Sequence, residues 1–97
     1  MLKDIDLSNT FKKSETGKYK YNSNLDINET IEIETELKED IIKELRIERI
    51  NNGKKEVIPL KFLVPSIIKD NQTIVIKGEG NIRNDERGNL NIKVIMN

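Results

Sequence analysis

Apolar and polar residues alternate along much of the chain, and this two-residue period predicts β-strands with one buried face and one solvated face. In the segment 29–37, ETIEIETEL, one face carries Ile31, Ile33, Thr35 and Leu37, and the other carries Glu32, Glu34 and Glu36. The same alternation marks four further segments, namely 43–50, 54–64, 73–78 and 90–96. We therefore predict about five strands and no helix of several turns, because no segment repeats its apolar residues at the helical spacing.

Turn residues separate the predicted strands. Asn52-Gly53 favours a tight hairpin, because both residue types tolerate the positive φ that such turns require. Pro59 falls on the solvated side of its segment, and its missing N–H predicts a strand at the edge of a sheet. Segment 37–42 is too short for a stable helix and predicts a single helical turn, while 78–89 predicts an open loop. The predicted fold class is all-β: a small two-sheet, antiparallel β-sandwich-like domain with a short helical turn.

The first part of the chain lacks this alternation. Residues 1–26 are polar with scattered apolar side chains, so we predict an irregular lead-in followed by one β-domain over residues 27–97. One weak extended pair is expected within the lead-in; it would join Ile5 and Leu7 to Tyr19 and Tyr21. The length of 97 residues suits a single small core.

The charged and reactive residue types argue against several classes of function. Lysine and arginine together number 17 and so do aspartate and glutamate, so the field that draws proteins to nucleic acid is absent. The chain has no cysteine and no histidine, which removes the usual thiolate nucleophile, general base and zinc ligands. No apolar run approaches the roughly 20 residues of a membrane span, and the N-terminus lacks the apolar stretch of a signal peptide. We expect a cytoplasmic protein with no metal, no cofactor, and no nucleic-acid or membrane partner.

Two pairs of adjacent carboxylates, Glu39-Asp40 and Asp85-Glu86, are the remaining candidates for acid–base chemistry. Both pairs fall in polar turns, where burial does not raise the pKa of a carboxyl group as such chemistry requires. We therefore name no catalytic residue and no metal ligand, and we predict that the chain is not an enzyme. A small hydrolase or ligand-binding β-domain, in which Asp85 and Glu86 would act, is an alternative from another class.

The stretch from residue 64 to residue 80, VPSIIKDNQTIVIKGEG, combines several loop and strand signals in a fixed order. These are a strand ending at Val64-Pro65, a polar turn at 69–72, a further strand, Gly78-Glu79-Gly80, and later Gly88-Asn89-Leu90. In this order they resemble the C-terminal, client-binding domain of the DnaJ co-chaperone family. The similarity extends over about residues 27–97, which is most of the predicted β-domain.

The chain also departs from the family pattern. Ile67, Asn71 and Asn89 stand where the family has glycine, glycine and aspartate, and the turn after Leu37 is shortened. These differences affect the loops more than the order of the strands. Without histidine the chain cannot carry the His-Pro-Asp motif of a J domain, and without cysteine it cannot carry the family's zinc-binding repeats. The resemblance therefore implies a module that binds a client but does not stimulate an ATPase.

By this resemblance the chain is a non-catalytic, co-chaperone-like module that binds extended hydrophobic segments of unfolded client polypeptides. The positions that match the family's peptide groove are Ile31, Ile33, Leu45, Ile47 and Ile92. Basic residues near that groove bind the acidic tail of a DnaK-type chaperone in the family, and Lys43 is the matching candidate here. We expect a monomer, with a dimer as the alternative.

Alternating isoleucines in a small β-domain are more often its core than its binding surface. Under this second interpretation all five groove residues are buried. The chain is then a structural or assembly domain whose open sheet edge pairs with itself or with another protein.

Overall fold

In a computed structural model that describes residues 4–6, 19–34 and 37–97, the chain forms two β-sheets with a hydrophobic core between them. The first sheet has four strands in the order β1 (Asp4–Asp6), β6 (Thr73–Ile76), β9 (Leu90–Met96) and β3 (Ile27–Ile33). The second sheet has five strands in the order β2 (Lys20–Tyr21), β8 (Glu86–Arg87), β7 (Ile82–Arg83), β4 (Ile41–Asn51) and β5 (Lys54–Val64). A turn of 3-10 helix, η1 (Ser23–Leu25), precedes β3. The predicted all-β, two-sheet class is confirmed.

Both sheets are mixed. The expected antiparallel pairing is present between β4 and β5 and between β6 and β9. In contrast, β3 and β9 pair in parallel over their full length, and β1–β6 and β2–β8 are also parallel pairs. The antiparallel part of the prediction is therefore corrected. A two-residue period determines which face of a strand is buried, but it does not determine the direction of the neighbouring strand.

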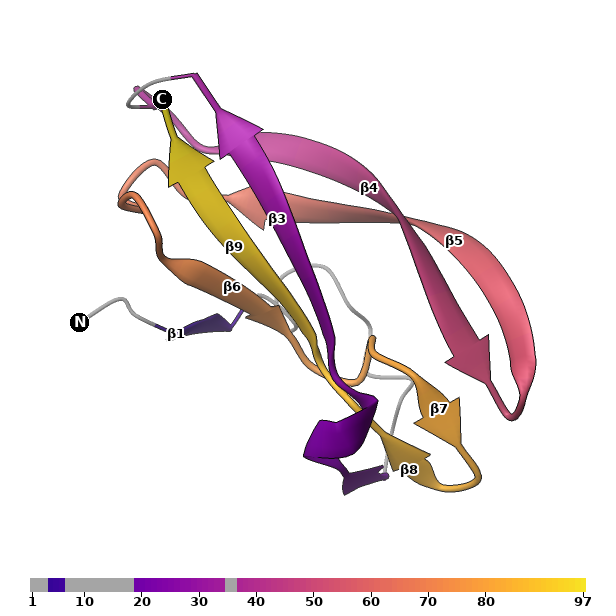
Figure 1. Cartoon of the computed structure of the whole chain (residues 1–97). Coiled ribbons are helices and arrows are strands. Elements are labelled where there is room, and N and C mark those ends of the chain that lie inside the picture. The colour runs from indigo at the N-terminus through magenta and orange to yellow at the C-terminus, as the bar shows by residue number, and fades with distance from the viewer. Residues whose placement is uncertain (1–3, 7–18, 35–36) are drawn as a thin grey trace.

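The longest element is the β4–β5 hairpin, in which each strand has 11 residues. Asn52 and Gly53 form its turn with φ values of 51° and 85°, and positive φ at both central residues is the pattern of a type I′ turn. The predicted hairpin is confirmed. Pro59 is exposed in β5, which is the outer strand of its sheet, as its missing N–H predicts. Figure 1 shows the hairpin crossing the first sheet and extending beyond it.

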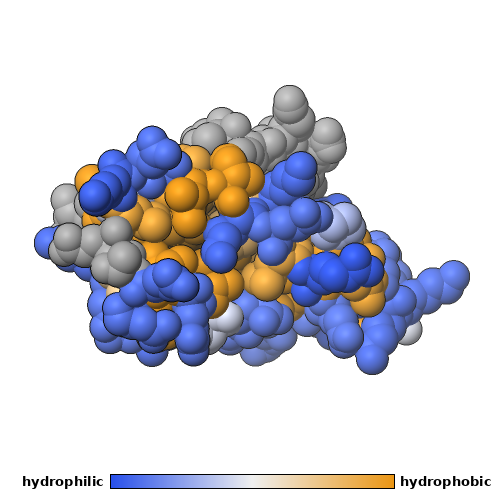
Figure 2. All heavy atoms as spheres, turned by 90° about the horizontal axis from the view of Figure 1, so that it is seen from above, coloured by the Kyte–Doolittle hydropathy of each residue, from blue (hydrophilic) through white to orange (hydrophobic). Residues whose placement is uncertain are grey.

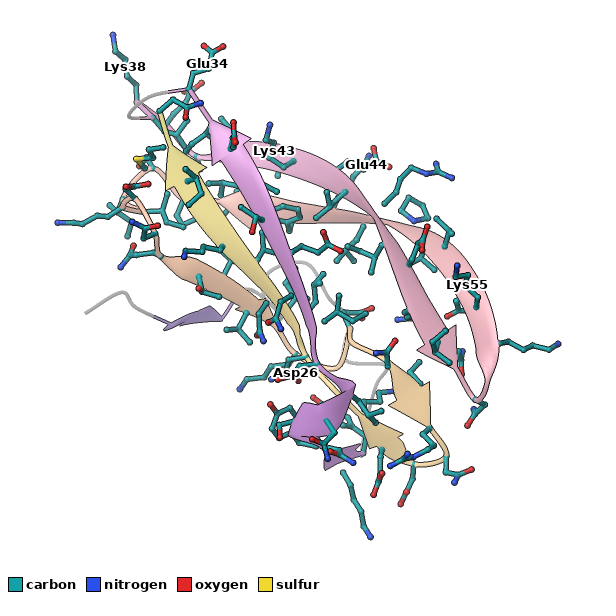
Figure 3. The ribbon with its side chains drawn as sticks, in the orientation of Figure 1. Asp26, Glu34, Lys38, Lys43, Glu44 and Lys55 are labelled. Carbon is teal, nitrogen blue, oxygen red and sulfur yellow. The ribbon has the colours of Figure 1, made fainter. Side chains whose placement is uncertain are left out.

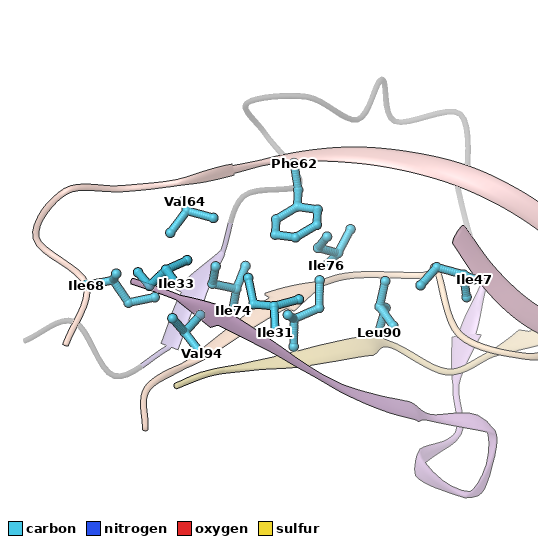
Figure 4. Packing of buried hydrophobic residues seen from close by; sticks show 11 residues of the cluster. Ile31, Ile33, Ile47, Phe62, Val64, Ile68, Ile74, Ile76, Leu90 and Val94 are labelled. Carbon is cyan, nitrogen blue, oxygen red and sulfur yellow. The ribbon is translucent and has the colours of Figure 1, made fainter. Parts of the chain in front are cut away.

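The core forms where the hairpin lies over the first sheet. Ile47 of β4 and Phe62 and Val64 of β5 are almost completely buried. Figure 4 shows Phe62 and Val64 pointing from β5 toward Ile33 and Ile74 of the first sheet. The buried cluster consists of Ile31, Ile33, Ile47, Phe62, Val64, Ile68, Ile74, Ile76, Leu90, Ile92 and Val94. Burial of these branched side chains is the main stabilising contribution that holds the two sheets together.

The lead-in contributes a strand to each sheet and is not irregular throughout. Ile5 pairs with Ile74 in the first sheet, and Tyr21 pairs with Arg87 in the second sheet. The predicted pairing of Ile5 with the tyrosines is therefore wrong, and Leu7 lies outside the described residues.

Glycines let the lead-in approach the rest of the domain closely. A Cβ atom at Gly80 or at Gly88 would overlap the backbone of Leu25. The amide of Asn81 donates a hydrogen bond of 2.8 Å to the carbonyl oxygen of Leu25. Residues around η1 therefore pack as part of the same body as the two sheets.

Two of the predicted loops differ from expectation. Residues 38–39 form bends, not a helical turn, and the carboxylate of Asp40 accepts a hydrogen bond of 2.8 Å from the Ser66 amide. The segment predicted as an open loop contains the short β7–β8 hairpin, whose turn has Asn84 at a φ of 57°. Each of these elements is shorter than the four residues over which an alternating pattern becomes visible in a sequence.

Candidate functional site

Four of the five predicted groove residues lie in the hydrophobic core. Ile31 and Ile33 on β3, Ile47 on β4 and Ile92 on β9 are each at most 9% exposed. The two sheets of the chain itself cover these side chains, so the expectation that they line an open groove is wrong. Peptide binding by this domain stays a prediction, and it requires a different surface.

Leu45 and Lys43 are the predicted site residues that remain accessible. Both are half-buried on the inner face of β4, where Leu45 packs against the edge of the core and Lys43 lies across from Phe62 on β5. Figure 3 shows Lys43 and Glu44 at successive positions of β4. The tail-binding role of Lys43 stays a prediction.

The main chain of β4 has one side turned toward β5 and one side turned away from it. On the side away from β5, the Ile50 amide donates to the Asn81 side chain at 2.7 Å, and the Asn52 amide donates to the Ile82 carbonyl at 2.8 Å. Strand geometry repeats every two residues, so the N–H and C=O groups of all even-numbered residues of β4 point away from β5. The position of Pro59 supports this assignment. Pro59 lies opposite Arg46, in a pair whose N–H groups both point out of the hairpin, so its missing N–H removes no hydrogen bond between β4 and β5.

Most of this outer side of β4 has no neighbouring strand among the residues that the structure describes. β7 pairs with β4 only at Asn51, opposite Ile82. From Ile42 to Glu48, four successive outward-facing positions therefore offer N–H and C=O groups that no described strand pairs with; they are Ile42, Glu44, Arg46 and Glu48. We call this stretch of main chain the β4 edge. Unpaired groups in an extended strand are a template for the addition of another strand.

Side chains on both faces border the β4 edge. On the outer face, Ile42 is 54% exposed and is followed by exposed Glu44 and Arg46. On the inner face, Leu45 would become more deeply buried if a strand were added beside it. Figure 2 shows that hydrophobic side chains reach the surface between hydrophilic ones when the molecule is seen from above.

The β5 edge, on the other side of the same hairpin, is protected. Its outward-facing main-chain positions are the odd-numbered residues, and Pro59 interrupts them near their middle. Exposed Lys55 and Lys61 lie on either side of Pro59 along this edge. Proline and lysine at a strand edge are two of the devices by which proteins prevent the addition of further strands.

The edge of β3 belongs to the first sheet and carries an inward-facing carboxylate. Its outward-facing groups belong to even-numbered residues, because the Ile27 amide and the Ile33 carbonyl are both hydrogen-bonded on the side of β9. Glu29 projects from the inner face of β3 and is half-buried. A charge directed inward at a strand edge disfavours the addition of a further strand there. Lys43 is a comparable inward-facing charge at one end of the β4 edge, but a lysine can keep its ammonium group in water beside an apolar surface.

An ion network fixes the turn end of the hairpin. Arg49 lies on the inner face of β4 and contacts Glu56 at 2.6 Å and Glu79 at 3.2 Å. The hydrogen bond from Arg49 is the main cause that holds the pKa of Glu56 below its usual value, with a smaller contribution from Asn51. Glu79 is only 4% exposed and belongs to the loop between β6 and β7. The network therefore joins the far end of the hairpin to the rest of the domain and keeps β4 extended.

The carboxylate pairs do not come together as an acid–base site in the described part of the chain. Asp85 is exposed in the β7–β8 turn. Glu86 accepts hydrogen bonds from Asn22 at 3.1 Å and Arg83 at 3.3 Å, which lower its pKa, with Asn22 the larger cause. A lowered pKa keeps the carboxylate ionised, whereas a general acid needs a raised one. No group of three or more potential metal ligands occurs among the described residues.

The β4 edge could not be located from the sequence. Alternation shows that Leu45 and Ile47 share a face, but it does not show which side chains from other parts of the chain cover each of them. The one local signal was Pro59, because a proline assigns the outward-facing positions of β5 and, through the hairpin register, those of β4.

No helix among residues 4–6, 19–34 and 37–97 is long and apolar enough to cross a membrane. No protein-family model, no curated protein and no solved structure matches the chain.

Proposed function

We propose that this chain is a non-catalytic β-domain that binds extended polypeptide segments by adding them as a strand to the β4 edge. The observation that supports the proposal is the row of unpaired main-chain groups from Ile42 to Glu48, beside the half-buried side chain of Leu45. Main-chain hydrogen bonds supply affinity that depends little on sequence, and alternate side-chain positions add a preference for apolar residues.

Strand addition differs from the groove that the sequence predicted. It needs only the margin of the core, so the domain keeps its buried isoleucines for stability and still offers a binding surface. A bound segment would place every second side chain beside Lys43 and Leu45 on the inner face. An apolar residue there would remove part of Leu45 from water, which would favour hydrophobic client segments over polar ones.

The resemblance of residues 27–97 to the client-binding domain of the DnaJ family supports a co-chaperone role for this binding. A cytoplasmic setting, unfolded clients and a DnaK-type partner all belong to that role. Each follows from the resemblance and is part of the proposal.

The test is a matched pair of proline substitutions. Glu44→Pro removes an outward N–H from the β4 edge without removing a hydrogen bond to β5, just as Pro59 does in the opposite strand. Lys61→Pro removes an outward N–H at the cross-strand position on the β5 edge. We expect Glu44→Pro to weaken binding of a reduced and alkylated, permanently unfolded polypeptide by at least about tenfold, the equivalent of roughly 1.4 kcal/mol.

Lys61→Pro serves as the control and should bind the unfolded polypeptide as the unsubstituted chain does. Thermal unfolding of both variants would show that each retains its fold. Equal binding by the two variants, or a loss confined to Lys61→Pro, would refute the proposed edge.

A further inference from the structure

The β4 edge has a symmetry that points to one particular occupant. Its outward-facing positions end at Ile42 on one side and at Glu48 on the other, because the next outward amide, that of Ile50, is already bonded to Asn81. Leu45 is the midpoint of this stretch. Glu44 and Arg46 flank Leu45 with opposite charges.

We infer that a second copy of the chain pairs with the β4 edge, with the two β4 strands antiparallel and a twofold axis beside Leu45. This inference rests on the proposed strand addition, and it identifies a partner for the same edge. In that arrangement Glu44 lies opposite Arg46 of the second copy, and Arg46 lies opposite Glu44. Opposite charges in directly facing cross-strand positions stabilise an antiparallel pair.

The main chain fits the same arrangement. Residues whose N–H and C=O groups face each other across an antiparallel pair exchange both hydrogen bonds. With Leu45 on the axis, every outward-facing residue lies opposite another one: Glu44 opposite Arg46, and Ile42 opposite Glu48. The Leu45 side chains of the two copies meet on the inner face and cover each other's exposed surface.

Neighbouring symmetric registers are less favourable. With Arg46 on the axis, Arg46 would lie opposite itself and Glu44 would lie opposite Glu48, so like charges would face each other. With Ile47 on the axis, Glu44 would lie opposite Ile50, whose amide is occupied by Asn81 and which adjoins the β7 pairing. The charge sequence and the length of the free edge therefore select the same register.

Such a pair is closed, because each copy uses its β4 edge and leaves the protected β5 edge outside. Dimer formation and client binding then compete for one site. A client would bind the monomer, and dilution would favour that binding by releasing the edge.

The test mixes two variants that each disrupt the pair. In a dimer of Glu44→Arg, arginine faces arginine at positions 44 and 46, and in a dimer of Arg46→Glu, glutamate faces glutamate there. Because like charges repel, each variant alone should dimerise at least about tenfold more weakly than the unsubstituted chain. When the two variants are mixed, every Arg lies opposite a Glu, and a heterodimer should form. Sedimentation velocity across a concentration series would measure all three cases.

A mixture that stays monomeric while the unsubstituted chain dimerises would overturn the Leu45-centred register. A chain that remains monomeric at every concentration would overturn the dimer. Neither outcome affects the proposed function, because that function depends on the main-chain groups of the edge and not on a second copy. Binding of the unfolded polypeptide to the unsubstituted chain, at a dilution at which the chain is monomeric, tests that function separately.

Discussion

The two edges of the β4–β5 hairpin belong to one element and have opposite character. On β5, a proline and two lysines border the outward-facing main chain. On β4, the corresponding stretch has no proline, its one lysine, Lys43, lies on the inner face, and its outer-face charges alternate in sign. Both strands have main-chain N–H and C=O groups that point away from the hairpin. The side chains beside these groups therefore determine which edge favours the addition of another strand.

Such a difference would limit strand addition in a small domain to one edge. A hairpin with two open edges could extend in both directions without limit. Protection of one edge restricts addition to a single site, and a single site gives a closed complex.

The largest effect is expected when the protection of β5 is removed. Pro59→Val together with Lys61→Thr restores an outward N–H and removes an edge charge, so both sides of the hairpin can then add strands. We expect the mass measured by light scattering to rise with concentration well beyond that of a dimer. Val57→Thr, which changes an exposed side chain on the same edge but keeps Pro59, should not show this rise. Identical masses for the two variants would mean that Pro59 does not protect the edge.

A large loss of stability is expected when the far end of the hairpin is released. Arg49→Met removes the guanidinium contact to buried Glu79, and the free energy of unfolding should fall by about 2 kcal/mol. Chemical denaturation would measure the change. Lys55→Met is the matched control, because Lys55 forms a long, exposed contact of 3.7 Å with Glu48 and its loss should cost less than about 0.5 kcal/mol. Similar values for both variants would show that the network does not anchor the hairpin.

The smallest effect is expected from acid. The pKa of Glu56 is lowered below its ordinary value of 4.5 in the folded state, chiefly by the hydrogen bond from Arg49. A lowered pKa contributes stability that is present above the unfolded pKa and is lost as pH falls through the folded pKa. Stability should therefore decrease below about pH 4.5, and Glu56→Gln should make that decrease shallower without removing it, because Glu86 also has a lowered pKa. A pH profile that Glu56→Gln leaves unchanged would contradict this assignment.

The sequence was most informative where strands are long. The predicted bounds of 54–64 and 90–96 agree with β5 and β9, and Asn52-Gly53 forms the predicted turn. These features are local, since they depend on alternation and on the φ preferences of single residues.

Non-local features could not be predicted in the same way. Nothing in the alternation of 27–33 indicates that its partner is the parallel strand 90–96. Ile47 and Leu45 have the same pattern in the sequence, yet Ile47 is fully buried and Leu45 is half-buried, because burial depends on which side chains from distant parts of the chain cover each position. The isoleucines predicted to form the site are therefore buried, and the candidate site lies at an exposed strand edge instead.

Amide hydrogen exchange at single-residue resolution on dilute protein, with and without the unfolded polypeptide, tests the central claim most directly. We predict that the Glu44 and Arg46 amides exchange rapidly in the free protein and are slowed at least about tenfold when the polypeptide binds, while the Lys61 and Leu63 amides do not change. Slowed exchange at Lys61 and Leu63 instead, or bound polypeptide with no change at Glu44 and Arg46, would contradict strand addition at the β4 edge.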